Sequence, residues 1–323
     1  MHTPHFKSVS FSSPKPGVRV LISGAVHGNE VCGSIAIRRV IAEIESQELQ
    51  LASGMVTFIP VTNTLAYQRG QRQGDRNLNR RLRPTEDPQE FEDHVANWLC
   101  PIMAQHQVLL DLHSFRAQGE AFVMVGPENN QGEVEPFQFA HEEQNLAQRL
   151  GVQRFVDGWL STYADGVARR KARSQTLNRA APSHNSDAQF GVGTTEYMRS
   201  VGGYALTLEC GQHQDPKAPE VAYQAILNTL RYLEVLAGEK PIANPQMEAL
   251  RIYEVVDKHH AGDQFARPWS SFDCLQKGDL IGHRHDGTAL IAQEDGRIIF
   301  PDANAAAEDE WFYLARSNPR LSE

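Results

Sequence analysis

The chain has 323 residues, of which 31 are Lys or Arg and 40 are Asp or Glu, so its formal charge is −9. Hydrophobic residues make up 41% and charged residues 22%, which is typical of a globular protein and excludes a disordered or fibrous chain. The acidic balance argues against nucleic acid as the main partner, because such partners need a basic surface. A typical domain has roughly 150 residues, so the length allows one large domain or a large and a small one.

Most of the chain alternates between predicted strands and predicted helices. Residues 18–25 form a continuous apolar run, which predicts a strand buried on both faces. Apolar residues at helical spacing then predict a helix from residue 31 to about residue 48. The same alternation continues with strands at 55–63, 106–114 and 204–211 and helices at 90–103, 137–151 and 219–236. The pattern predicts an α/β fold with helices on both faces of one sheet, and functional groups where strands end.

Two later segments break this alternation. Residues 157–195 show little periodicity, and we expect an irregular insertion that is either a functional lid or a mobile loop. Gly and Pro at 237–245 predict a linker, and the short apolar runs after it, separated by turn signals, predict strands. We therefore expect a catalytic α/β domain at residues 1–240 and a small β domain at 246–323.

The cysteines and the N-terminal region bear on the cellular compartment. Cys32, Cys100, Cys210 and Cys274 lie far apart and form no CxxC pair, which argues against a cysteine zinc site or a disulfide framework. No apolar stretch approaches the roughly 18 residues of a membrane span, and no signal-peptide pattern opens the chain. We expect a cytoplasmic protein with no membrane partner.

Three short motifs place ligand-type residues at the ends of predicted strands. GAVHGNE contains His27 and Glu30 on a glycine-flanked turn, and DLHS contains His113. LTLECG contains Glu209 in a run that is otherwise apolar, where a carboxylate is costly to bury without a role. Each motif alone is weak evidence. Together they match a catalytic zinc site, which needs three protein ligands, an open position for water and a base.

The order of four motifs resembles the succinylglutamate desuccinylase/aspartoacylase family, whose members are relatives of the zinc carboxypeptidases. The motifs are HGNE at 27–30, GDRNLNR at 74–80, DLHS at 111–114 and LECG at 208–211. The resemblance spans essentially the whole chain, since the family also ends in a small β domain. It implies a zinc-carboxypeptidase-like mixed sheet with helices on both faces, one zinc per subunit, and hydrolysis of the amide between an acyl group and an amino acid.

The resemblance also assigns roles to particular residues. The metal ligands it implies are His27, Glu30 and His113, and the catalytic residue is Glu209. The substrate-binding residues it implies are Arg72, Asn79 and Arg80. A guanidinium suits that task because its planar fork holds a carboxylate through two hydrogen bonds.

Some positions depart from the family pattern or stay undecided. Asn77 stands where aspartoacylases tend to carry Asp, and the stretch between His113 and Glu209 is longer than in a succinylglutamate desuccinylase. The later arginine of the family has three candidate matches, Arg116, Arg169 and Arg173. In the GDRNLNR region, Arg76 is undecided, and we expect Arg81 and Arg83 to belong to a solvated basic face.

The motifs lead to the hypothesis of a zinc-dependent deacylase acting on a small N-acyl amino acid, either N-acetyl or N-succinyl. One alternative is a metallocarboxypeptidase that trims peptides and shares the metal site. A second alternative is a non-catalytic zinc or small-molecule binding protein of the same fold. The oligomeric state stays open, with a homo-oligomer as one alternative.

Overall fold

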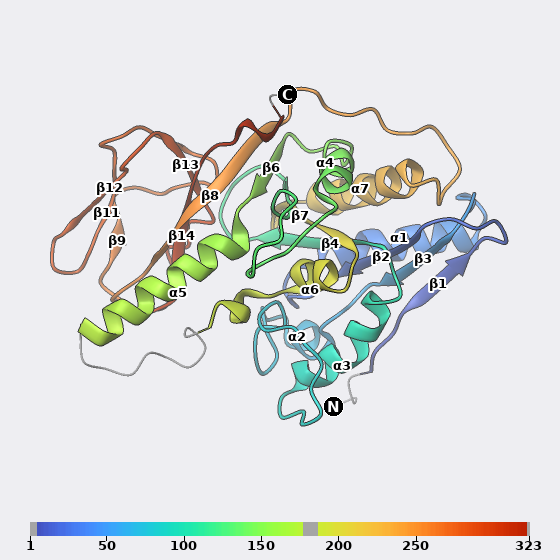
Figure 1. The fold of residues 1–323 in the computed structure, drawn as a ribbon, viewed down its shortest axis with the longest axis horizontal. Helices are drawn as coiled ribbons and strands as arrows, with labels where there is room; N and C mark the ends of the chain where they lie inside the picture. Colours follow the sequence, from blue (N-terminus) through green and yellow to red (C-terminus); the bar gives the residue numbers. More distant parts are fainter. Residues whose placement is uncertain (1–4, 177–186, 322–323) are drawn as a thin grey trace.

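The computed structural model describes residues 5–176 and 187–321. Within them, eleven strands form one mixed sheet in the order β1-β3-β2-β4-β7-β5-β6-β8-β14-β13-β10, and β12-β11-β9 form a smaller sheet (Figure 1). The strands of the first part of the chain are β1 (Val9–Ser12), β2 (Arg19–Gly24), β3 (Met55–Ile59), β4 (Val108–Phe115), β5 (Phe122–Met124), β6 (Arg154–Asp157) and β7 (Tyr204–Gln212). Those of the last part are β8 (Glu248–Asp257), β9 (Gln264–Phe265), β10 (Cys274–Leu275), β11 (Leu280–His283), β12 (Ala289–Ile291), β13 (Gly296–Ile299) and β14 (Glu310–Ser317).

The strands β3, β2, β4 and β7 run parallel and form the centre of the sheet. Successive residues of one strand pack on opposite faces, which explains the continuous apolar runs in the sequence. In β2, for example, Val20 and Ile22 belong to one hydrophobic cluster and Leu21 to another. The predicted buried strands are therefore confirmed.

Helices cover both faces of this central part (Figure 1). The helices are α1 (Cys32–Glu45), α2 (Thr64–Arg69), α3 (Phe91–Met103), α4 (Ala140–Ala147), α5 (Trp159–Thr176), α6 (Thr194–Ser200) and α7 (Ala218–Tyr232), with short 3-10 turns at Ala188–Gly191 and Pro319–Leu321. Helices α1 and α7 pack together on the face that includes Val20, and α3 and α6 pack on the face that includes Leu21. This arrangement confirms the predicted α/β fold class.

The C-terminal region is all β, as predicted, and it continues the main sheet. Strand β8 pairs in parallel with β6, and β14 and β13 follow in antiparallel register. The three-stranded sheet β12-β11-β9 lies beside them. Because the main sheet runs without a break into this region, residues near β14 share a cavity with the central strands.

The prediction of an irregular insertion at 157–195 is wrong over much of its length. Helix α5 spans Trp159–Thr176 and lies along β8 (Figure 1). Its buried face has apolar residues at helical spacing only at Leu160, Tyr163 and Val167 and continues through Arg170 and Ser174, so the apolar pattern covers only the first half of the helix. Burial of Arg170 is possible because Asp257 accepts two hydrogen bonds from its guanidinium, at 2.8 and 2.6 Å. Residues 177–186 of the predicted insertion lie outside the described residues.

No helix in the described part of the chain combines the length and the apolar content needed to cross a lipid bilayer.

Candidate metal centre

One loop and the end of one strand, both at the carboxyl edge of the parallel strands, carry the predicted ligands. His27 and Glu30 lie between β2 and α1, and His113 lies near the end of β4. Strands β2 and β4 are neighbours, with Gly24 opposite Leu112, so the two segments end at the same edge. The turn after His27 requires glycine, because a Cβ on Gly28 would lie only 2.0 Å from the backbone of α2.

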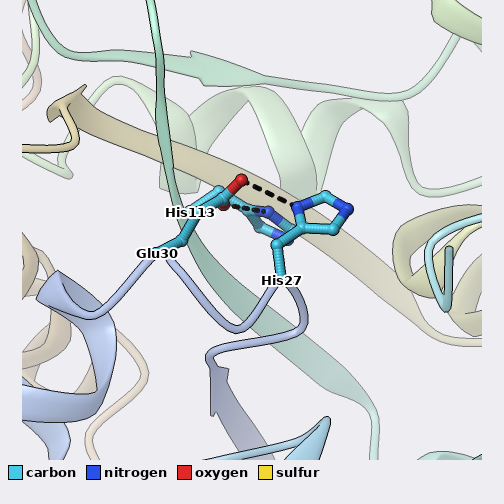
Figure 2. A group of neighbouring side chains, drawn as sticks. All are labelled: His27, Glu30 and His113. Carbon is cyan, nitrogen blue, oxygen red and sulfur yellow. Dashed lines mark hydrogen bonds and ion pairs between the residues drawn. The ribbon is translucent and has the colours of Figure 1, made fainter. Parts of the chain in front are cut away.

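The three side chains converge, and all are buried (Figure 2). Glu30 lies between the two imidazole rings, with its Oε1 2.9 Å from His27 Nδ1 and its Oε2 2.9 Å from His113 Nδ1. One ligand-type atom from each residue lies within 4.8 Å of the others. His27 Nδ1 has no aligned hydrogen bond in spite of its burial. A buried nitrogen of this kind is costly unless it binds something else, and a metal ion would satisfy it.

The outer nitrogens of both rings have acceptors. His113 Nε2 lies 2.8 Å from Asp111 Oδ2, and His27 Nε2 lies 3.0 Å from Asn77 Oδ1. Metal-binding histidines commonly donate their second N–H to such an acceptor, which fixes the ring and the tautomer. Both rings are thereby oriented with Nδ1 toward Glu30. The donor set of two imidazoles and one carboxylate suits zinc, and it leaves a fourth position open.

Glu209 lies in β7, directly opposite His113 in the strand register. Its side chain is 8% exposed, lines the cavity, and has no hydrogen-bond partner for Oε2. Burial and the nearby Glu30 carboxylate raise the pKa of Glu209 to about 8 in the metal-free chain, and burial lowers the pKa of His27 to about 4. Both shifts have the same main cause, because burial disfavours the charged form of each side chain. A cation held by the three ligands would favour the ionised form of Glu209.

The GDRNLNR loop is held in place by one buried carboxylate from α3. Glu92 accepts backbone N–H groups from three consecutive residues, at 2.8 Å from Gly74 and at 3.1 Å from both Asp75 and Arg76. The Arg76 guanidinium pairs with Asp93 at 2.8 Å, so this undecided residue fastens the loop to α3. The loop is thereby positioned against the metal-ligand group.

Of the predicted substrate-binding residues, Asn79 and Arg80 lie in this loop and Arg72 lies two residues before it, and all three line the same cavity. Arg72 Nη1 lies 3.0 Å from Glu30 Oε1, and its side chain is 44% exposed. Asn79 Oδ1 accepts the Thr194 N–H at 2.9 Å. Arg80 is more enclosed, because its Nη2 donates to Glu310 Oε2 at 3.1 Å and its guanidinium lies against the ring of Trp159.

The cavity has a volume of about 850 Å³ and reaches from the metal-ligand group to β14. Of the three candidates for the later arginine, Arg116 lines it, whereas Arg169 and Arg173 are not among its lining residues. Arg116 pairs with Asp302 at 2.7 Å on the outer part of the wall.

Sequence reasoning missed several residues of the cavity. His213 lines it, four residues beyond Glu209, and its Nδ1 lies 2.8 Å from Ser114 Oγ. Its proximity in sequence to Glu209 is a signal that could have identified it. The far wall contains Tyr163, Glu310 and Tyr313, which lie in segments with no motif. Only the three-dimensional fold brings them to the site.

Comparisons with known proteins identify a matching family model and a shared fold. Residues 16–140 match the family model of the succinylglutamate desuccinylase/aspartoacylase catalytic domain. The predicted resemblance to this family is therefore confirmed. No curated protein sequence matches the chain.

Solved structures share the fold over nearly the whole chain. A succinylglutamate desuccinylase/aspartoacylase from Rhodobacter sphaeroides has a TM-score of 0.72 at 17% identity, covering 98% of this chain and 91% of that one. The product-bound ectoine utilization protein EutE (DoeB) from Ruegeria pomeroyi has a TM-score of 0.71 at 15% identity, with coverages of 96% and 88%. A succinylglutamate desuccinylase from Silicibacter sp. TM1040 has a TM-score of 0.69 at 15% identity, with coverages of 97% and 89%. At these identities the likeness concerns the fold.

Proposed function

Starting from the confirmed resemblance to the succinylglutamate desuccinylase/aspartoacylase family, we propose that the chain is a zinc-dependent deacylase that hydrolyses the amide bond of an N-acyl amino acid. The observation that carries the proposal is the convergence of His27, Glu30 and His113 beside Glu209, at one end of a polar cavity. His27, Glu30 and His113 supply the metal ligands, and the cavity is large enough for a small substrate.

His27, Glu30 and His113 would hold one zinc ion per subunit through the two Nδ1 atoms and the carboxylate. A bound zinc supplies Lewis acidity toward a carbonyl oxygen and lowers the pKa of a water molecule toward neutrality. Asp111 and Asn77 keep the two rings in the orientation that this binding requires.

Glu209 is the general base in this proposal. Its unpartnered Oε2 accepts the proton of the attacking water and then passes it to the nitrogen of the leaving amino acid. A residue that only supported a bound metal would have no need of a buried, unpaired carboxylate oxygen. This feature favours an enzyme over the alternative of a non-catalytic zinc-binding protein.

The loop residues bind and orient the substrate. Arg80 and Asn79 hold a substrate carboxylate, and Arg72, next to the ligand Glu30, lies beside the scissile carbonyl and helps to polarise it. Because the carboxylate and the scissile carbonyl are both held, binding energy is used to place the amide carbon correctly for attack by water. Residues 1–240 contribute the ligands, the base, these anchors and Tyr163 of the far wall, while residues 246–323 contribute Glu310 and Tyr313 to that wall.

The proposal includes a cytoplasmic location. All four cysteines are free thiols, three of them buried, which fits a reducing compartment.

Metal analysis followed by a screen for free-amine release tests the function. The screen covers N-acetyl and N-succinyl amino acids together with short peptides. We expect one zinc per chain and release of the amino acid from one acyl series. Preferential cleavage of peptides would favour the metallocarboxypeptidase alternative, and bound zinc without any turnover would favour a binding protein.

A further inference from the structure

Arg81 differs from the other arginines of the cavity. Seven arginines line it, and six of them are paired with carboxylates. These pairs are Arg72 with Glu30, Arg76 with Asp93, Arg80 with Glu310, Arg116 with Asp302, Arg170 with Asp257, and Arg199 with Glu143. Among residues 5–176 and 187–321, the Arg81 guanidinium has no acidic partner.

The sequence predicted that Arg81 belongs to a solvated basic face, and its side chain is indeed exposed. Arg81 also lines the cavity that contains the candidate metal ligands, so its exposed guanidinium can contact a bound substrate. We propose that Arg81 is a specificity-determining residue at the cavity mouth, where it binds a second carboxylate of the substrate, remote from the scissile amide. The inference rests on the proposed function and extends it to the recognition of a further charge.

The backbone of Arg81 supports a functional role. Its φ is +47°, in the left-handed region that residues other than glycine rarely adopt. Strain of this kind persists where the surroundings enforce it, and it is common at ligand-binding sites. Here the Arg81 N–H donates to Phe190 O at 2.9 Å, and the N–H of the buried Leu82 donates to Val192 O at 2.9 Å. These two hydrogen bonds fix the strained turn to residues 190–192, of which Phe190 also lines the cavity.

The adjacent residue explains why a second cation is useful. The charge of Arg80 is already balanced by Glu310, so Arg80 acts on a substrate carboxylate mainly through directed hydrogen bonds. Arg81, one residue away, adds a positive charge that forms no ion pair with a described residue, since Glu90 and Asp93 beside it are paired with Arg76. A substrate with two carboxylates can therefore engage Arg80 inside the cavity and Arg81 at its mouth, whereas a substrate with one carboxylate engages only the former.

The test compares isosteric substrates that differ by one charge. N-acetylglutamate and N-acetylglutamine differ in the side-chain carboxylate, and N-succinylglutamine and N-succinamoylglutamine differ in the acyl carboxylate. One pair or the other identifies the source of the second charge. In Arg81→Asn we expect kcat/KM for the doubly charged member to fall about tenfold, mainly through KM, with little change for the singly charged member. An equal change for both members of both pairs would overturn the proposal.

Two further variants separate recognition from structure. Arg81→Gly removes the guanidinium but suits the positive φ, so we expect the same loss of discrimination with a Tm at least equal to that of the wild type. If Arg81→Gly lowers the Tm but still discriminates between doubly and singly charged substrates as the wild type does, the role of Arg81 is purely structural. Arg83→Asn is the matched control, since Arg83 is exposed on the same loop and is not among the residues that line this cavity. It should leave discrimination unchanged.

A binding arm separates failure of this inference from failure of the proposed function. Calorimetry with the zinc-loaded protein measures the affinity for glutarate and for butyrate, which differ by one carboxylate. We expect Arg81→Asn to weaken glutarate about tenfold and to leave butyrate unchanged, whether or not any acyl amino acid is hydrolysed. Equal affinities of wild type and variant for glutarate would contradict the role of Arg81, even if the deacylase activity is found.

Discussion

Arg80 and Glu310 lie 230 residues apart in the sequence and form an ion pair of 3.1 Å in the wall of the cavity. The Tyr313 hydroxyl also donates to the Glu310 carboxylate, and the ring of Trp159 lies 4.8 Å from the guanidinium. Residues of strand β14 therefore fix the position of Arg80, which we propose to anchor the substrate. The C-terminal region takes part in forming the site.

A double-mutant cycle tests this pair. Arg80→Met removes the nearer of the two guanidiniums beside Glu310 and leaves only that of Arg170, 4.0 Å away, and we expect the free energy of unfolding to fall by about 2 kcal/mol. The same change should raise KM for N-acyl amino acids by at least tenfold. Adding Glu310→Gln should restore most of the stability and none of the binding. Urea unfolding and steady-state kinetics of the three variants measure both effects, and additive losses of stability would contradict the coupling.

Replacing Glu209 separates the metal from the proton transfer. Glu209→Gln keeps the shape of the side chain but removes the base, so we expect kcat to fall by about 10²–10⁴. The zinc content should stay at one per chain, because Glu209 does not belong to the group of candidate ligands. A variant that keeps a near-normal rate would contradict the assignment of the base.

Asn77 accepts the outer N–H of His27, and its replacement tests the orientation of that ligand. In Asn77→Leu the N–H has no acceptor, and we expect zinc affinity to fall about 10- to 100-fold. In Asn77→Asp a carboxylate takes the place of the amide and should retain or raise the affinity. Competition with a chromophoric chelator gives both values, and a leucine variant of unchanged affinity would argue against the arrangement.

Much of the fold could be predicted because the central strands are buried on both faces and the helices around them are amphipathic. The candidate ligand motifs could be found because each one lies near the end of such a strand or just after it. Helix α5 could not, since its buried face contains Gly166 and Arg170. The pairing of Arg80 with Glu310 and the seating of His213 against Ser114 also escaped prediction. These contacts depend on which strands are neighbours, and local patterns do not encode that.

The C-terminal region contains a carboxylate whose titration should affect stability. Asp263 is buried, and burial alone would raise its pKa, but hydrogen bonds from Arg284 and from the backbone of His285 and His259 lower the pKa to about 2. A lowered pKa in the folded state stabilises the fold above the unfolded-state pKa of about 4, and this stabilisation disappears as the pH falls toward 2.

Asp263→Asn should therefore lower the free energy of unfolding at pH 7 by about 2 kcal/mol. The difference from the wild type should shrink as the pH falls from about 4 to 2. Urea unfolding across this range measures it, with Asp165→Asn as a control at an exposed position of α5. A difference that stays constant with pH would mean that the ionised carboxylate is not its cause.

The central claim is that a metal held by His27, Glu30 and His113 hydrolyses N-acyl amino acids. Its most direct test is the rate of amino-acid release from an N-acyl amino acid by the zinc-loaded protein, by the chelator-treated protein, and by the latter after one equivalent of zinc is added. The account predicts release, loss of release and recovery, with no recovery in a His113→Ala variant. Release that persists after complete removal of the metal would contradict it.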